Sequence, residues 1–481
     1  MKERSDQSFL TLFGRDFGLY TLANALPAIL GLIGVMVFSR VFDPAPYGRY
    51  SLVLVVVMTV STGVYSWLEQ SVLRFESEDV EILPTVEAIL LYLTIFVSVI
   101  SLLVFTIIEP AIGQYRRYYL VAVVSVVGVG TFDVLRAFFQ ANLNPRYITY
   151  FQGINSLLKL LVGVVISLLV LENIVGWMWG TALGSIFTIG VMLHMLDVEL
   201  PSLDTEIAKQ LFRYGAPMVG WLFGLTLLNF IDRVILEWLS GASAVGIYSS
   251  NYSLVHTGLP LVLNPVIQSS HPVIMDRWNG ENSEEVSELI TKYSRYFLLI
   301  GVGATIFTAI ISKPLSSVVL GQSFHEGYII IPIIGLSLFF WNIAMLGHKG
   351  LELKSMTEFM TAGILISVIL NILLNYLLIP QFGYVGASFA TLISSLSYLI
   401  FSIGSSKYTV AWRVPNSTIK NILVSGTPAV ALGGAVYLIQ GSQLLWIVFA
   451  GFGACGLYIL SLISLREVKI GDIKQLVSRD R

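Results

Sequence analysis

The sequence predicts an all-α polytopic membrane protein, and three observations support this fold class. Apolar residues make up 55% of the 481 residues, whereas charged residues make up 12%. The mean hydropathy is +0.79, and apolar runs recur along the whole chain between short polar breaks. An ordinary globular domain carries about 25% charged residues, so a soluble chain with this composition could not cover its surface.

Fourteen apolar runs are each about as long as a membrane-spanning helix, which needs roughly 20 residues. The first run has no small-residue cleavage site, so we interpret it as a retained span and not as a signal peptide. The predicted spans are 17–38, 50–72, 86–108, 119–141, 151–171, 177–196, 215–239, 247–270, 295–312, 328–347, 359–379, 386–404, 421–440 and 444–463.

The positive charges predict the orientation of these spans. An even number of spans places both termini on one side of the membrane. With both termini inside, 20 of the 28 Lys and Arg residues fall on the inside, five fall on the outside and three fall within spans. Because positive residues favour cytoplasmic loops, we expect a multi-pass protein of the cell membrane with both termini cytoplasmic.

The composition also excludes several functions. The chain has one cysteine, Cys455, so neither a disulfide framework nor a cysteine-based metal site is expected. The net charge of −2 provides no basic footprint for nucleic acid. No P-loop and no H-E-x-x-H motif occurs. We therefore expect no metal and no cofactor, and the short external loops leave no room for a catalytic domain outside the membrane.

An internal repeat divides the spans. Gly48-Arg49-Tyr50-Ser51 at the second span matches Gly246-Ile247-Tyr248-Ser249 at the eighth. The same offset of 198 residues aligns polar residues on one helical face of both spans, namely Thr59 with Thr257, Ser66 with Asn264 and Gln70 with Gln268. A second match aligns Gly176-x-x-x-Gly180-Thr181 with Gly386-x-x-x-Ala390-Thr391.

The repeat predicts two six-helix lobes related by an axis along the membrane normal, followed by two extra helices. The expected divisions are residues 1–200 for the first lobe, 201–404 for the second, and 405–481 for the last two spans and a cytoplasmic tail. Because the repeat already supplies a cavity between the lobes, we expect a monomer.

Ionisable residues within spans are costly and mark candidate sites. In the fourth span Asp133, Arg136, Gln140 and Asn144 form one polar stripe, and Gln70 and Arg74 lie in the second span and Lys159 in the fifth. One interpretation is that Asp133 neutralises Arg136 while Arg74 and Lys159 reach the interface. The other is a cationic pocket near the cytoplasmic side that binds a lipid phosphate. In that interpretation Arg74, Arg136, Lys159, Gln140, Gln70, Gln268 and Asn264 contact the substrate.

The second lobe carries a different set of polar groups. Asp232 and Arg233 are adjacent in the seventh span, so their side chains point about 100° apart and need not pair. Asp232 is a candidate site for a coupling cation or proton, and a structural ion pair with another helix is an equal alternative.

Three motifs resemble those of Wzx-type oligosaccharide flippases, the polysaccharide biosynthesis proteins of the multidrug/oligosaccharidyl-lipid/polysaccharide exporter superfamily. They are Asp43-Pro44-x-x-Tyr47-Gly48-x-Tyr50-Ser51, Asp232-Arg233 with Gly246-x-Tyr248-Ser249, and Asn371 to Thr391 with Pro380 and Gly383. The resemblance implies movement of a polyprenyl-linked oligosaccharide from the cytoplasmic to the outer leaflet by alternating access.

The leading hypothesis is therefore a flippase whose partners are the lipid-linked oligosaccharide, the bilayer and glycan-assembly enzymes. A multidrug exporter of the same superfamily is the first alternative, although such exporters usually have acidic cavities. A membrane-embedded glycan polymerase or ligase is the second alternative.

Overall fold

The computed structural model describes residues 25–76, 81–141, 145–196, 201–278, 282–440 and 444–468, and within these ranges the protein is helical and has no β-strand. The helices are Ala25–Val41, α2 (Pro44–Phe75), α3 (Leu83–Ile108), α4 (Arg116–Ala141), α5 (Pro145–Val165), α6 (Val175–Met195), α7 (Thr205–Ser240), α8 (Ala242–Gly258), α9 (Pro260–Arg277), α10 (Ser283–Ile310), α11 (Ser312–Val319), α12 (Ile330–Gly347), α13 (Lys349–Leu353), α14 (Thr357–Ser406), α15 (Asn416–Gln440) and α16 (Leu444–Ser464). Short 3₁₀ or π segments are η1 (Gly113–Tyr115), η2 (Ile166–Val170) and η3 (Gln322–Ile329).

The predicted polytopic all-α fold is confirmed. In the described part of the chain, 11 helices are long and apolar enough to cross a membrane. The 50-residue helix α14 holds two predicted spans, 359–379 and 386–404. The first predicted span is represented by the shorter apolar helix Ala25–Val41, and its residues 17–24 lie outside the described ranges.

The eighth predicted span, 247–270, is divided between α8 and α9. Pro260 is the first residue of α9. Proline has no backbone N–H to donate into the preceding turn. This ends α8 at Gly258, so two helices of 17 and 18 residues cover the range expected of one span.

A turn interrupts α14. Gly383 has φ 55° and ψ −136°, a conformation that side chains rarely adopt. The two arms pack closely beside the turn, because a Cβ added to Gly386 would lie 2.4 Å from the carbonyl oxygen of Leu378. Proline and glycine are typical turn residues and a small residue permits close helix packing, so Pro380, Gly383 and Gly386 agree with this geometry.

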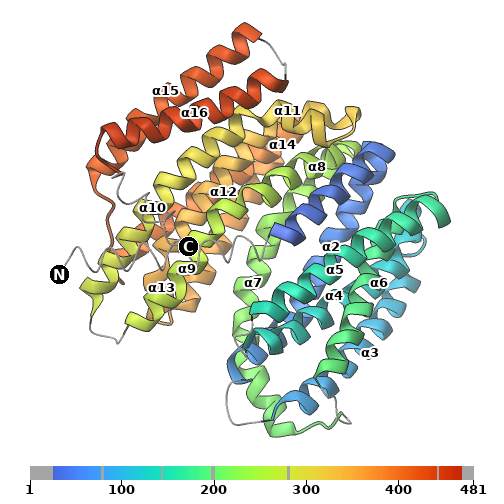
Figure 1. Cartoon of the computed structure of the whole chain (residues 1–481). Coiled ribbons are helices and arrows are strands. Elements are labelled where there is room, and N and C mark those ends of the chain that lie inside the picture. Colours follow the sequence, from blue (N-terminus) through green and yellow to red (C-terminus); the bar gives the residue numbers. More distant parts are fainter. Residues whose placement is uncertain are drawn as a thin grey trace. The chain divides into compact units, whose positions relative to one another are not determined.

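The described helices form two compact units. Unit 2 is Ile29–Ser249, and unit 1 contains residues 25–28 and the described residues from Ser250 onward. In unit 2, α2 packs against α4 and α7, while α6 packs against α4 and α5. In unit 1, α12 packs against α14 and α10. Figure 1 shows the helix order within each unit. The predicted division of the spans at residues 200 and 404 stays a prediction.

Glycines on α6 bring α5 unusually close. A Cβ on Gly180 would lie 2.4 Å from the carbonyl oxygen of Lys159, and a Cβ on Gly184 would lie 2.8 Å from the Lys159 nitrogen. A Cβ on Gly176 would lie 2.3 Å from the nitrogen of Ser167 in the π segment η2. Small residues permit such backbone contacts in lipid, where van der Waals packing drives helix association.

The two Gly-x-Tyr-Ser motifs of the internal repeat contact each other in unit 2. A Cβ added to Gly48 would lie 1.9 Å from the carbonyl oxygen of Ala242, and a Cβ added to Gly246 would lie 1.9 Å from that of Pro44. Pro44 and Ala242 are themselves related by the offset of 198 residues. The start of α2 therefore crosses the start of α8 through a reciprocal contact in which each glycine faces the equivalent carbonyl of the other helix.

The last two helices pack on α10. α15 and α16 form an apolar core with α10 through Leu299, Ala429 and Tyr458. At one end of this core Glu467 accepts hydrogen bonds from Arg295 Nε at 2.8 Å, Thr418 Oγ1 at 2.7 Å and Asn421 Nδ2 at 2.8 Å. Burial acts to raise the pKa of Glu467, but the hydrogen bonds from Thr418 and Asn421 and the charge of Arg295 outweigh it and lower the pKa.

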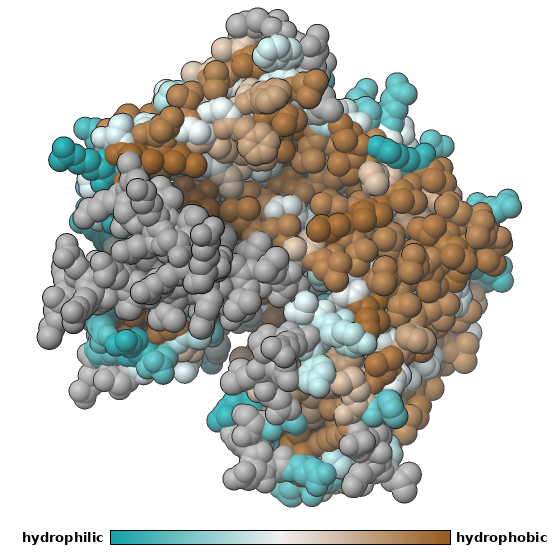
Figure 2. Space-filling view, viewed as in Figure 1, coloured by the Kyte–Doolittle hydropathy of each residue, from teal (hydrophilic) through white to brown (hydrophobic). Residues whose placement is uncertain are grey.

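The outer surface of the helices is apolar, as contact with lipid requires. On α3, Phe96, Leu102 and Ile107 are 55%, 65% and 77% exposed. Figure 2 shows broad apolar areas on the face in view, with hydrophilic side chains gathered toward the ends. A soluble protein rarely exposes apolar patches larger than a few hundred square ångströms, so these surfaces are interpreted as lipid-facing.

The Gly48–Gly246 contact predicts that neither position tolerates a side chain. Gly48→Ala and Gly246→Ala should each destabilise the protein by about 1–3 kcal/mol or more, because the added methyl would overlap a backbone carbonyl. Gly190→Ala is the control, since nothing lies within 4 Å of its Cβ and alanine favours a helix. Heating followed by size-exclusion chromatography in detergent measures the effect. Equal melting of all three variants would contradict the close contact.

Candidate functional site

The centre of the predicted polar stripe is an ion-pair cluster in unit 2. Arg136 on α4 donates through Nη2 to Glu69 Oε1 on α2 at 3.1 Å and to Asp133 Oδ1 at 3.4 Å. The side chains of Arg136 and Glu69 are each 20% exposed and that of Asp133 is 37% exposed. The packing of α2 against α4 brings Glu69 to this site, and the sequence stripe on α4 alone did not identify it as the partner.

Lys159 extends the cluster from α5. Its ammonium lies near enough to Asp133 for their charges to attract each other. Two basic and two acidic side chains therefore balance within the helix bundle, namely Arg136, Lys159, Glu69 and Asp133. The Arg136 guanidinium nevertheless lacks one hydrogen bond, because its Nε is buried and has no acceptor among the described residues.

Other predicted contacts in unit 2 lie further along the helices. Gln70 is half-buried and directly follows Glu69, whereas Gln140 at the end of α4 is exposed. Arg74 is exposed in the last turn of α2, and its guanidinium lies over the ring of Phe75, 5.6 Å from the centroid. Asn144 lies outside the described residues. The structure thus brings together Arg136, Lys159 and their carboxylates, while Arg74 lies beyond them toward the helix end.

The two predicted contacts from the second lobe, Asn264 and Gln268, lie on α9 in unit 1 and are half-buried. The Oε1 atom of Gln268 is buried and has no hydrogen-bond donor among the described residues. A buried amide oxygen without a donor costs free energy, so this atom is suited to receive a hydrogen bond from a bound molecule.

Asp232, the candidate coupling site, is fully buried within unit 2. Its Oδ2 accepts a short hydrogen bond from the Tyr248 hydroxyl, and its Oδ1 accepts from the backbone nitrogen of Arg233 at 2.7 Å. The Arg233 guanidinium donates to Ser249 Oγ at 3.1 Å and to the Asn229 carbonyl at 3.0 Å. A cation at Asp232 would therefore compete with the Tyr248 hydroxyl for the carboxylate.

A second buried cluster in unit 1 was not identified from the sequence. Lys349 Nζ donates to Glu352 Oε2 at 2.5 Å and approaches His271 Nδ1 at 2.8 Å. His348 Nε2 is hydrogen-bonded to Glu352 Oε1 at 2.8 Å, and His348 Nδ1 is hydrogen-bonded to the Tyr398 hydroxyl at 2.8 Å. His348 is 2% and Lys349 is 4% exposed. The sequence signal for this cluster was the spacing His348-Lys349-x-x-Glu352. Residues three and four positions apart are neighbours on a helix surface, so His348 and Lys349 both lie next to Glu352.

This cluster predicts a strong coupling between Lys349 and Glu352. Lys349→Met should destabilise the protein by about 3–5 kcal/mol, because it leaves a buried carboxylate without its cation. Lys349→Met/Glu352→Met should recover much of that loss. Lys354→Met, at an exposed position five residues away, is the control. Thermal unfolding in detergent tests the cycle, and a double variant no more stable than Lys349→Met would contradict the pairing.

Comparison with known proteins places these features in a family. Residues 13–278 match the family model described as polysaccharide biosynthesis protein. The capsular polysaccharide biosynthesis protein CapF of Staphylococcus aureus is 24% identical over 80% of this chain and 97% of CapF. The probable flippase AglR of Haloferax volcanii is 25% identical over 61% of this chain and 62% of AglR.

Other curated relatives match over shorter stretches. The chain spans about half the length of two of them. It covers 54% of an uncharacterised membrane protein of Methanocaldococcus jannaschii and 44% of the probable low-salt glycan biosynthesis flippase Agl15 of Haloferax volcanii. Each of these two relatives is 22% identical to the chain over the matched residues.

The fold is also that of solved transporters. The structure of the lipid II flippase MurJ in an inward closed conformation superposes with a TM-score of 0.78 at 13% identity, covering 93% of this chain and 99% of MurJ. An inward-facing multidrug resistance MATE family transporter gives a TM-score of 0.61 at 13% identity, covering 83% of this chain and 94% of that protein. The match to the family model extends over more than half of the sequence, and the chain belongs to the polysaccharide biosynthesis protein family.

Proposed function

We propose that this protein is a flippase that carries a polyprenyl-linked oligosaccharide from the cytoplasmic to the outer leaflet by alternating access. Relatives named as probable flippases, and the fold shared with a lipid II flippase, support a transporter over a glycan polymerase or ligase. The substrate is a precursor of a cell-surface polysaccharide or of a glycoprotein glycan. The protein acts as a monomer that receives its cargo from glycan-assembly enzymes.

One observation carries the choice of substrate class. Arg136 lies inside an apolar span, yet its buried Nε still has no acceptor among the described residues while its Nη2 holds two carboxylates. A phosphate has several acceptor oxygens and fits the guanidinium fork, and arginine remains charged when buried. The phosphate of a lipid-linked sugar cannot cross hydrocarbon without such a partner.

The balanced charges around Arg136 favour reversible binding of a phosphate over permanent binding. Without cargo, Glu69 and Asp133 hold the charge of Arg136 inside the membrane. A phosphate that approaches Arg136 replaces them as partner, with Lys159 and Arg74 contributing further positive charge and Gln70 and Gln140 binding sugar hydroxyls. When the phosphate leaves, the carboxylates return to Arg136. Release is therefore not opposed by an uncompensated buried charge.

The proposal assigns roles to three further polar residues, Asn264, Gln268 and Asp232. Asn264 and Gln268 receive the cargo from α9, and the buried oxygen of Gln268 accepts a hydrogen bond from a sugar hydroxyl. Asp232 is the coupling site, where a cation or a proton replaces the hydroxyl of Tyr248.

Variants of Arg136 test the proposed phosphate contact. Arg136→Ala should abolish glycan export in a deletion strain, whereas Arg136→Lys should retain part of it, because lysine keeps the charge and loses the fork. Export is measured as surface glycan at matched expression. A drug-resistance assay on the same strains tests the exporter alternative, which predicts altered drug sensitivity with unchanged glycan.

The control separates substrate binding from simple charge balance. If Arg136 serves only to neutralise its neighbours, Glu69→Gln/Asp133→Asn/Arg136→Ala should restore export, since the triple variant removes the unpaired carboxylates. The proposal expects the triple variant to be folded and inactive. Normal export by Arg136→Ala or by the triple variant would contradict it.

Cysteine labelling tests the proposed orientation. Cys455 is first replaced by alanine, and single cysteines are then placed at three exposed positions, Ser323, Gln381 and Glu284. With both termini cytoplasmic, impermeant maleimide added to intact cells should label positions 323 and 381. It should label position 284 only after lysis. Labelling at position 284 in intact cells would contradict the proposed orientation. It would also place Arg136 nearer the outer side of the membrane than the cytoplasmic side.

A further inference from the structure

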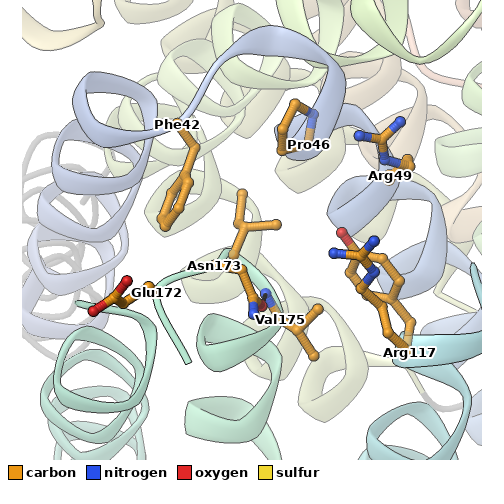
Figure 3. Close-up of a pocket in the computed structure, with 9 residues that line it drawn as sticks. Phe42, Pro46, Arg49, Arg117, Glu172, Asn173 and Val175 are labelled. Atoms are coloured by element: carbon orange, nitrogen blue, oxygen red, sulfur yellow. Dashed lines mark hydrogen bonds between the residues drawn. The ribbon is translucent and has the colours of Figure 1, made fainter. Parts of the chain in front are cut away.

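A small pocket at one end of unit 2 has no role in the proposed transport site. It has a volume of about 200 Å³ and lies where α2, α4 and the connection between α5 and α6 meet. Arg49, Arg117, Tyr118, Glu172 and Asn173 are among its lining residues. Figure 3 shows Arg49 and Arg117 together on one side of the pocket and Glu172 on the opposite side. We refer to it as the arginine pocket.

Arg49 and Arg117 both line the pocket without a carboxylate partner among the described residues. Arg49 Nη1 donates to Gln114 Oε1 at 2.9 Å, which fixes its position with a neutral group. Neither Arg49 nor Arg117 has an Asp or Glu oxygen within 4.0 Å among the described residues, whereas the neighbouring Arg116 pairs with Glu109 at 2.9 Å. Two like charges that line one small pocket repel each other, so an anion bound there would stabilise the arrangement.

The remaining lining residues shape the pocket and leave it positive. Tyr118 is 3% exposed and forms a fixed wall. Asn173 accepts from the Val175 nitrogen at 3.0 Å and donates to the Leu171 carbonyl at 2.8 Å, which fixes the rim at the start of α6. With Glu172 on the far side, the charged lining groups are two arginines and one carboxylate.

The location points to a lipid phosphate. Arg49 lies in the second turn of α2 and Arg117 in the first turn of α4, where apolar helices meet the polar surface of the membrane. Basic pockets between membrane helices bind phosphate head groups. A cavity of about 200 Å³ is smaller than a drug-sized pocket, which is about 300–1,000 Å³. It can hold a phosphate group but not a whole oligosaccharide.

We propose that the arginine pocket binds the phosphate group of a lipid at the end of unit 2 opposite the cytoplasmic side. The forks of Arg49 and Arg117 donate to the phosphate oxygens from α2 and α4, and the acyl or prenyl chain stays in the surrounding bilayer. The source of the phosphate is an anionic phospholipid or a polyprenyl phosphate carrier. Binding at this pocket is independent of the proposed transport and can be measured without any glycan.

Native mass spectrometry of the purified, delipidated protein in detergent tests the proposal. The probes are dioleoylphosphatidylglycerol, a polyprenyl phosphate and zwitterionic dioleoylphosphatidylcholine. Arg49→Ala/Arg117→Ala should weaken binding of a phosphate-bearing anionic lipid about tenfold or more, because it removes two charge-assisted contacts. Arg40→Ala/Arg116→Ala removes the same charge near the same end but outside the pocket, and it should bind as the wild type does. Arg117→Ala alone, at an exposed side chain, should show a smaller loss and guards against misfolding of the double variant.

The results distinguish the two possible lipids and also show whether the proposal is wrong. Loss confined to polyprenyl phosphate identifies the carrier, and loss for both anionic lipids identifies a general head-group site. Inorganic phosphate at millimolar concentration should compete in either case. Equal loss in the pocket and control variants, or equal binding of the zwitterionic and anionic lipids by the wild type, would overturn the proposal.

Discussion

The absence of hydrogen-bonding solvent within the bilayer is the constraint on which this structure depends. A charge inside a span costs several kcal/mol unless another group holds it. Three charged groups in the described helices meet this requirement differently. Arg136 is held by Glu69 and Asp133, Asp232 by the Tyr248 hydroxyl, and Lys349 by Glu352 beside His271. These clusters join neighbouring helices, so they stabilise the packing and also mark where a charged cargo or ion could be exchanged.

Close backbone packing is the second requirement, since helices in lipid gain little from the hydrophobic effect. The glycines of α6 allow α5 to approach it, and Gly48 and Gly246 allow α2 and α8 to cross. The second contact joins equivalent positions of the internal repeat. The duplication of a six-helix unit that the sequence predicts would account for the same glycine, tyrosine and serine at both helix starts, because each copy would supply the same surface to the crossing.

Much of the fold could be predicted from the sequence, because hydropathy identifies the spans and glycine and proline identify the turn at Gly383. The division of α8 from α9 at Pro260 was visible as a residue type but was not interpreted as a helix boundary. The candidate site was predicted in part. Spacing on α4 placed Asp133 beside Arg136, and Lys159 was grouped with them in the predicted pocket, whereas Glu69 approaches from another helix whose rotation a single sequence does not reveal. Tertiary packing also brings Lys349 to His271, 78 residues away. It places Arg49 and Arg117 in one pocket in the same way.

Reconstitution tests whether this chain moves a lipid-linked glycan across a bilayer. The purified protein is placed in vesicles that contain a polyprenyl-linked oligosaccharide with a fluorescent label on the sugar, and an impermeant reductant is added outside. We expect that fluorescence from the inner leaflet is also lost in vesicles with the wild-type protein, and that vesicles with Arg136→Ala retain it as protein-free vesicles do. Loss of the inner-leaflet signal at the same rate in all three preparations would contradict the account.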